Sequence, residues 1–246
     1  MPSVGAAQDP GLRDLSVKAK EFEALSSVGE SLKVVLRPEI GFPEEYVGYW
    51  DTAIDQAFAP DLLEADYLAA LEPVLSSESK LAMAEFLDSD IGKEIAAIGS
   101  AADEEGDEAA RVARGKAYLE AASPERKAQF DRLKASQGDA NRADLIMDVY
   151  FRAMVIAATP IIGAEDARAW ELSAGDLRTG YVEDSYLAAV AGASQLSEEH
   201  FAALIEAAET PEIKAYAEHS NMAFGKALHA AADRLEITYE EARNGN

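Results

Sequence analysis

Two stretches of the chain share one pattern, and this duplication constrains the fold more than any other feature. Residues 196–228 read LSEEHFAALIEAAETPEIKAYAEHSNMAFGKAL, and a weaker copy begins at Leu75 with LSSESKLAMAEFLDSDIGKEIAAIGSAAD. When Leu75 is aligned with Leu196, acidic residues, a serine and a lysine recur at matching positions. The residues Tyr-Leu-Ala-Ala precede both copies, at 67–70 and 186–189. A pattern that returns in this way predicts a fold built from two related units.

Each copy predicts a helix, a corner and a second helix. Ser76 and Ser197 are candidate N-caps, because a serine oxygen can accept from the free N–H groups of a first helical turn. Ser89 and Thr210 are candidate caps for the second helix. Pro211 suits the first position of that helix, where its missing N–H costs nothing.

Apolar side chains recur three or four positions apart in both copies, which is typical of a helix that faces a core. The members of this stripe are Met83, Phe86, Leu87, Ile91, Ile95 and Ile98 in the first copy, and Phe201, Leu204, Ile205 and Ala208 in the second. We expect residues 62–102 and 181–228 to adopt the same fold and to pack together about an approximate two-fold axis. Phe86 and Ile205 should then be buried.

The rest of the chain also has helical patterns. Ser27 and Glu30 form a possible capping box, which predicts a helix start there and a stop before Pro38. Residues 141–158 predict a long helix that is apolar nearly all round, and therefore central, followed by a loop at 159–163. No stretch alternates with the period of a strand. We therefore predict an all-α, multi-helix bundle built from two related helical repeats.

The repeats also predict how the chain is divided. We expect a disordered N-terminus at 1–11, a first helical repeat unit at 12–122 and a second at 123–240. The two units should form one globular body, because a single amphipathic hairpin cannot bury its apolar stripe alone. The last residues, 241–246, should fray.

The order of the repeated residues resembles a bacterial family, the domain of unknown function numbered two-zero-five-nine. The resemblance rests on Leu-Ser-Glu-Glu at 196–199, Glu-Thr-Pro at 209–211 and Lys214, with Asp-Ser-Asp-Ile-Gly-Lys at 88–93 in the first copy. The first copy departs from the family pattern at Asp90, where proline is usual. The second departs at Ile213, where glycine is usual. The resemblance implies an all-helical protein exported to the periplasm or beyond, with no catalytic residue to carry over.

The composition excludes several classes of partner. Asp and Glu number 46 against 22 Lys and Arg, which gives a formal charge of −24. Such a polyanion repels nucleic acid and anionic lipid. The absence of cysteine excludes disulfides, thiol catalysis and cysteine-based zinc sites. We expect no membrane insertion, because no run approaches the roughly 20 apolar residues of a membrane span.

The N-terminal residues bear on localisation. MPSVGAAQDPGLRD carries neither the basic start nor the apolar core of a signal peptide. Because the family resemblance implies export, we expect the native gene to encode about 20 further residues before Pro2. A periplasmic or secreted protein is the expectation.

The three histidines are the first candidates for chemistry. His219 and His229 lie ten residues apart, so on one helix they point about 80° apart and cannot form a metal pair. His200 follows a cap and is expected on a helix surface. The acidic residues around Gly106 fail the spacing of a calcium-binding loop and predict a solvated turn. We therefore predict no catalytic, cofactor-binding or metal-ligating residue.

Two other groups have alternative interpretations. Lys93 and Lys214 occupy matching places near a helix start, where a lysine opposes the dipole, and a salt bridge to a neighbouring acid is the favoured explanation. Trp50, Trp170 and the tyrosines are either core residues or the lining of a groove between helices.

Three functions remain open. The first is a non-enzymatic module for protein interaction or envelope maintenance, with an unidentified protein partner. The second is a binder of a small apolar ligand or lipid fragment in an interhelical cavity. The third is a hydrolase. A pocket of several hundred Å³ would favour the second function, and a flat apolar patch would favour the first. The oligomeric state is not predicted.

Overall fold

The computed structural model describes residues 11–40, 43–136, 141–173 and 175–245. Within these residues the chain forms thirteen helices and no strand, which confirms the all-α prediction. The helices are α1 (Leu12–Lys18), α2 (Glu21–Ile40), α3 (Glu44–Ala57), α4 (Pro60–Leu71), α5 (Ser77–Asp88), α6 (Asp90–Glu105), α7 (Glu108–Ala121), α8 (Pro124–Ser136), α9 (Arg142–Ile162), α10 (Ala164–Ser173), α11 (Gly175–Ala193), α12 (Glu198–Ala208) and α13 (Pro211–Asn244).

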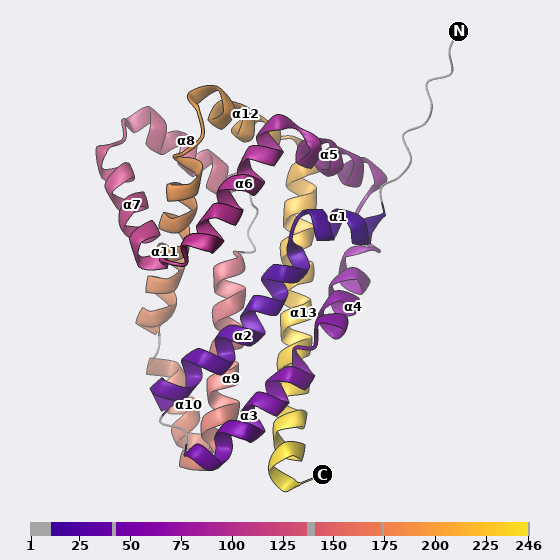
Figure 1. Cartoon of the computed structure of the whole chain (residues 1–246), viewed down its shortest axis with the longest axis vertical. Coiled ribbons are helices and arrows are strands. Elements are labelled where there is room, and N and C mark those ends of the chain that lie inside the picture. Colours follow the sequence, from indigo (N-terminus) through magenta and orange to yellow (C-terminus); the bar gives the residue numbers. More distant parts are fainter. Residues whose placement is uncertain (1–10, 41–42, 137–140, 174, 246) are drawn as a thin grey trace.

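Helix α13 is the element on which several other helices pack. Its 34 residues run the length of the long axis, and α3, α4, α5 and α9 pack along it (Figure 1). Ala223, Ala227 and Ala231 are completely or almost completely buried at four-residue spacing, so this face of α13 lets neighbouring helices approach closely. The helix continues to Asn244 and ends at Gly245 in the left-handed conformation. The predicted fraying of 241–246 therefore concerns residues that are helical as far as Asn244 in this structure, and it stays a prediction.

The larger hydrophobic cluster surrounds α13. It combines side chains from α1–α4 with others from α9 and α13. Trp50 is fully buried and meets Tyr239 edge-on, with ring centroids 5.2 Å apart. Phe22 and Tyr67 form a second edge-on pair at 5.8 Å. Because these residues come from both halves of the sequence, the halves share one core.

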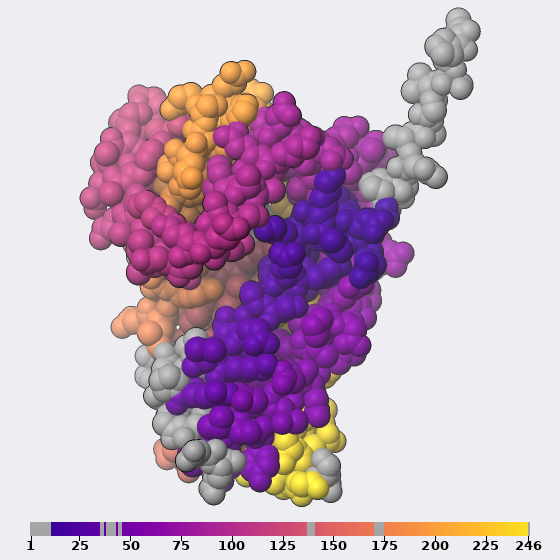
Figure 2. All heavy atoms as spheres, viewed as in Figure 1, coloured from indigo at the N-terminus to yellow at the C-terminus, as the bar shows by residue number. Residues whose placement is uncertain are grey.

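A second, smaller cluster joins α8, α11 and α12. Its buried members are Phe130, Val190, Leu196, Phe201 and Ile205. Phe130 and Phe201 have ring centroids 4.8 Å apart, and the Arg126 guanidinium lies 4.1 Å from the Phe201 centroid. Helices α6, α7 and α12 lie at the upper left of Figure 2, and the diagonal of α1 and α2 separates them from α3 and α4. The burial of Ile205 confirms its prediction.

Most of the predicted helix starts are confirmed. The hydroxyls of Ser76, Ser89 and Ser197 each accept a 3.1 Å hydrogen bond from the N–H three residues later. Pro211 occupies the first turn of α13. Thr210 precedes that turn, but its hydroxyl donates 2.8 Å back to the carbonyl oxygen of Ala207 and does not cap the helix.

The first two helices break at a different place from the one predicted. Helix α2 passes through Ser27 and Pro38 without interruption, so neither the capping box nor the stop is correct. The Ser27 hydroxyl donates 2.8 Å to the carbonyl oxygen of Ala24, a bond made inside a helix. The break falls at Lys20, whose φ of 59° is left-handed. The local preference of Ser27 and Glu30 for a helix start is overridden by tertiary packing along α2.

Helix α9 also extends further than predicted. Asn141 caps it, accepting 2.9 Å from the N–H of Ala143. The helix passes through Pro160 to Ile162 before Gly163, at φ 89°, ends it, so the predicted loop at 159–163 is wrong. Pro160 has no backbone N–H and therefore removes one hydrogen bond of the helix. The loss of stability is small because Pro160 lies in the last turn of α9. Met147, Val149 and other α9 residues are buried in the larger cluster, as expected of a central helix.

By length and composition α9 could also cross a membrane, since its mean hydropathy is 1.7 over a window of 18 residues. It is the one helix of the described residues that passes this test. The statement that no run approaches such a length is therefore wrong. In this structure α9 packs against α2, α10, α11 and α13. The absence of membrane insertion stays a prediction.

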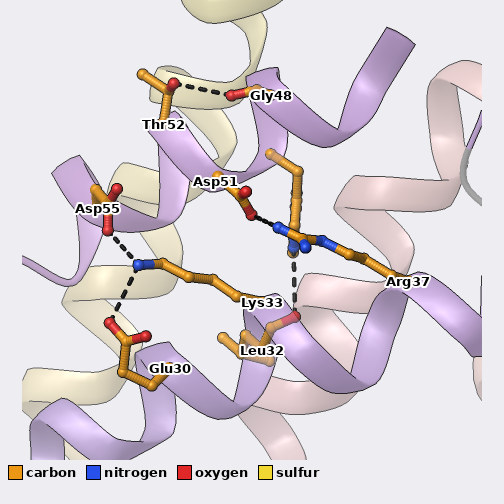
Figure 3. A network of polar contacts seen from close by, with 9 residues as sticks. Glu30, Leu32, Lys33, Arg37, Gly48, Asp51, Thr52 and Asp55 are labelled. Atoms are coloured by element: carbon orange, nitrogen blue, oxygen red, sulfur yellow. Dashed lines mark hydrogen bonds and ion pairs between the residues drawn. The ribbon is translucent and has the colours of Figure 1, made fainter. Parts of the chain in front are cut away.

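Ion pairs link α2 to α3 at the surface. Lys33 pairs with Glu30 on its own helix and with Asp55 on α3, while Arg37 pairs with Asp51 (Figure 3). Exposed pairs of this kind contribute at most about 1 kcal/mol each. The α2–α3 packing therefore depends mainly on buried groups such as Trp50, whose indole N–H donates 3.3 Å to the carbonyl oxygen of Leu32.

The two sequence copies contact each other reciprocally. Helix α13 of the second copy packs on α4 and α5 of the first, and α6 of the first copy packs on α11 and α12 of the second. The copies differ in length, because α13 has 34 residues and its counterpart α6 has 16. The two-fold relation itself stays a prediction.

We predict that Gly115→Ala weakens the contact between α7 and α11. A Cβ at Gly115 would lie 1.9 Å from the carbonyl oxygen of Leu187, so the two backbones must separate. Overpacking costs about 1–3 kcal/mol. The control is Gly99→Ala in α6, where a Cβ meets open space and alanine should stabilise the helix by up to about 1 kcal/mol. Urea unfolding measures both free energies, and equal changes in the two variants would contradict the close approach.

Candidate functional site

A cavity of about 600 Å³ lies between the two hydrophobic clusters. This volume falls within the usual range of small-molecule sites. The lining comes from α2, α5, α8, α9, α11, α12 and α13, so residues far apart in sequence meet at one space.

The walls of the cavity are mainly apolar. They comprise Met83 and Phe86 of α5, Phe130 and Leu133 of α8, Ala189, Val190 and Ala193 of α11, Leu204 and Ala208 of α12, and Ile213 and Ala217 of α13. Phe86 is only half-buried, so the prediction that it lies in the core is wrong. Its side chain lines the cavity instead.

Four polar residues form one part of the lining, which we call the polar end: Glu21, Arg142, Ser220 and Asn221. Arg142 donates from Nε to the Asn221 side-chain oxygen at 2.6 Å. Its Nη2 lies 2.9 Å from both Glu21 Oε1 and Ser220 Oγ, and 2.8 Å from Glu21 Oε2. The Ser220 hydroxyl also lies 2.9 Å from Glu21 Oε1. The polar end is thus a connected network around one guanidinium.

The helices place these groups in a largely apolar setting. Glu21 is the first residue of α2, Arg142 is the first of α9, and Ser220 and Asn221 interrupt the buried face of α13. Glu21 is only 4% exposed, so its carboxylate needs a counter-ion and hydrogen bonds to offset the lost hydration. Although burial opposes the charged form of Arg142, the nearby Glu21 carboxylate keeps the pKa of Arg142 above its usual value.

Two tyrosines adjoin the polar end, and one of them, Tyr216, also lines the cavity. The Tyr67 hydroxyl is 2.9 Å from Ser220 Oγ, and burial together with the Glu21 charge raises the pKa of Tyr67 to about 12. Burial also raises the pKa of Tyr216, beside Tyr67. The Tyr216 hydroxyl has no well-formed hydrogen bond to any described residue. Both phenols therefore stay neutral at physiological pH.

Lys134 adds a positive charge to the lining. Its ammonium lies 4.9 Å from the ring centroid of Tyr186, which also lines the cavity. Lys134 itself is exposed, and it forms no hydrogen bond or salt bridge with a described residue. Tyr181 and Ser185 complete this side of the lining.

The candidates taken from the sequence do not meet at the cavity. His200 pairs through Nδ1 with Glu94 of α6, whereas His219 and His229 lie ten residues apart on α13. No group of three or more acidic or histidine residues is placed to hold a metal ion in the described part of the chain. Lys93 and Lys214 are exposed, and neither comes within salt-bridge distance of a described carboxylate, although the charge of Lys93 contributes to lowering the pKa of the neighbouring Asp88, after the larger effect of Lys18.

Some of the aromatic candidates are core residues, and others line the cavity. Trp50 is a core residue, as its contacts with Tyr239 show. The side chain of Trp170 lies outside the described residues. The aromatic residues that do line the cavity are Phe86, Phe130, Tyr181, Tyr186 and Tyr216. The acidic turn at 103–108 contains Gly106 at φ 65°, which ends α6 in the left-handed conformation.

Sequence reasoning missed Glu21 and Arg142, which are separated by 121 positions. One local signal was present for Arg142, because an arginine in a first helical turn opposes the helix dipole and calls for another partner. The pair Ser220-Asn221 on an otherwise apolar helix face was a second signal.

Comparisons with known proteins add no assignment. No family model, no curated protein and no solved structure matches this chain. The site must therefore be interpreted from its own chemistry.

We predict that alkali destabilises the fold through its buried tyrosines. Because the pKa of Tyr67 is raised from 10.0 to about 12, the folded chain holds this proton more tightly than the unfolded chain. The stabilisation is complete below pH 10 and is lost as the pH rises toward 12. It amounts to about 2–3 kcal/mol for Tyr67. Urea unfolding between pH 9 and pH 12 measures the slope, which Tyr67→Phe should reduce; an unchanged slope would contradict the prediction.

Proposed function

We propose that this chain binds a small, largely apolar molecule in the cavity between its two hydrophobic clusters. The observation that carries the proposal is a cavity of about 600 Å³ with apolar walls and a single polar network. Ligand sites commonly combine a mainly apolar lining with a few polar groups that fix orientation. The hydrogen bonds and ion pair around Arg142 hold those polar groups in position before a ligand arrives.

The surface supports this function over a protein-interaction module. The exposed large apolar side chains come from seven helices and from the connection between α4 and α5: Val17, Val34, Tyr49, Leu62, Val74, Ile161, Ile162, Leu177, Met222 and Ile237. Single exposed apolar residues are normal on soluble proteins, whereas an interaction site is expected to gather them into one patch.

A hydrolase has less support. General-base catalysis requires a base within hydrogen-bond reach of the reacting group. None of the three histidines lines the cavity. The resemblance of the repeated motifs to an exported bacterial family implies export, so we place the proposed binding in the periplasm or outside the cell. That setting is part of the proposal.

The proposed function predicts that the chain takes up an uncharged, environment-sensitive dye. Nile red should become strongly fluorescent in its presence and saturate at one dye per chain. Ala217 is half-buried and lines the cavity, so Ala217→Trp should fill part of the space and weaken the dye's affinity about tenfold or more. Fluorescence titration measures this affinity.

The matched control is Ala202→Trp on α12, where the alanine is exposed and does not line the cavity. This variant should bind Nile red like the parent chain. Circular dichroism confirms that both variants are folded. Equal affinities of the two tryptophan variants would place the dye elsewhere and contradict the proposed function.

A further inference from the structure

Arg142 has hydrogen-bonding capacity that the protein does not use. Its Nε and Nη2 atoms are bonded to Asn221, Glu21 and Ser220, and its guanidinium lies 4.9 Å from the Phe224 ring centroid. No bond to a described residue uses Nη1. The side chain is 34% exposed although it lines the cavity, so the guanidinium is held on one side and open on the other. Nη1 is therefore the donor left for a ligand.

The charge around the cavity is opposite in sign to that of the whole protein. The ionisable side chains of the lining, apart from the phenols, are Glu21, Lys134 and Arg142, which sum to one positive charge. In the full chain acidic residues outnumber basic ones by 46 to 22. The first residues of α9 also line the cavity, and the N-terminus of a helix of 21 residues carries partial positive charge. These features favour a single negative charge on the ligand.

The net charge of −24 does not cancel this local preference. Exposed charges are screened beyond about 8 Å at physiological ionic strength, whereas contacts inside a partly buried site are screened much less. An ammonium head group would add a like charge to a lining that already carries the positive charges of Arg142 and Lys134. A hydroxyl could accept from Nη1, but it lacks the negative charge that adds Coulomb attraction between the ligand and the guanidinium.

Resting on the binding function proposed above, we propose that the ligand is an aliphatic carboxylate. Its head group accepts from Arg142 Nη1 at the polar end, and its chain lies along the walls formed by α5, α8, α11 and α12. A carboxylate carries one charge, which matches the single positive charge of the lining. It also accepts from guanidinium N–H groups in a favourable geometry.

The test is displacement of Nile red by three compounds of equal chain length, namely decanoate, decan-1-ol and decylamine. The compounds are used below their micellar concentrations at neutral pH. Decanoate should displace the dye at about tenfold lower concentration than decan-1-ol, because only the carboxylate brings a charge opposite to that of the guanidinium. Decylamine, which is protonated at this pH, should be the weakest.

Variants locate the head group. Lys134→Met should weaken decanoate about two- to fivefold and leave decan-1-ol unchanged, as expected for one partly exposed charge. The matched control is Lys127→Met, which removes an exposed lysine of the same helix that does not line the cavity. The double variant Glu21→Gln/Arg142→Met should lose the preference for decanoate. If this double variant fails to fold, the order in which the three compounds displace Nile red from the parent chain still tests the carboxylate assignment.

The outcomes separate the two proposals. If decan-1-ol or decylamine displaces the dye as well as decanoate does, the carboxylate assignment is wrong and the binding function stands. If Nile red does not bind in the cavity and none of the three compounds binds, the proposed function is wrong. A decanoate preference that Lys127→Met reduces as much as Lys134→Met would place the head group on the general surface and overturn the inference.

Discussion

The structure depends on covering one long helix. Helix α13 has 34 residues and buries side chains along most of its length, so α3, α4, α5 and α9 must pack around it. Burial of apolar surface contributes roughly 25 cal/mol per Å², and Phe224, Leu228 and Leu235 on this helix are almost completely hidden. The apolar face is interrupted at Ser220-Asn221. At that place the neighbouring helices supply Glu21 and Arg142 in place of apolar side chains.

That interruption links the fold to the site. A buried ion pair loses hydration that its mutual attraction only partly repays, and well-packed apolar residues often give equal or greater stability. Stability alone is therefore a weak reason for the Arg142–Glu21 pair. Under the proposed binding function, the pair has a further role, because it holds the guanidinium of Arg142 in place as a donor for a ligand. Phe86 lines the same cavity and is only half-buried.

Local features of this fold could be predicted from the sequence, and long-range ones could not. The caps at Ser76, Ser89 and Ser197 depend on bonds within three residues, so the sequence pattern was enough. The capping box at Ser27 was locally plausible, yet the unbroken packing of α2 overrides it. The pairing of Glu21 with Arg142 depends on how α2, α9 and α13 pack together. The two residues are 121 positions apart, and sequence spacing does not predict contacts at that separation. The cavity was foreseen only as one alternative, because an empty space depends on the packing of seven helices.

The central claim is that the cavity between the two clusters holds an apolar chain. The most direct measurement is a crystal structure of the protein with 10-bromodecan-1-ol, an uncharged compound whose bromine gives an anomalous signal. The account predicts a bromine peak inside the cavity, against apolar walls such as Phe130 and Leu204. Bromine peaks confined to the outer surface, with the cavity free of the compound at saturating concentration, would contradict it.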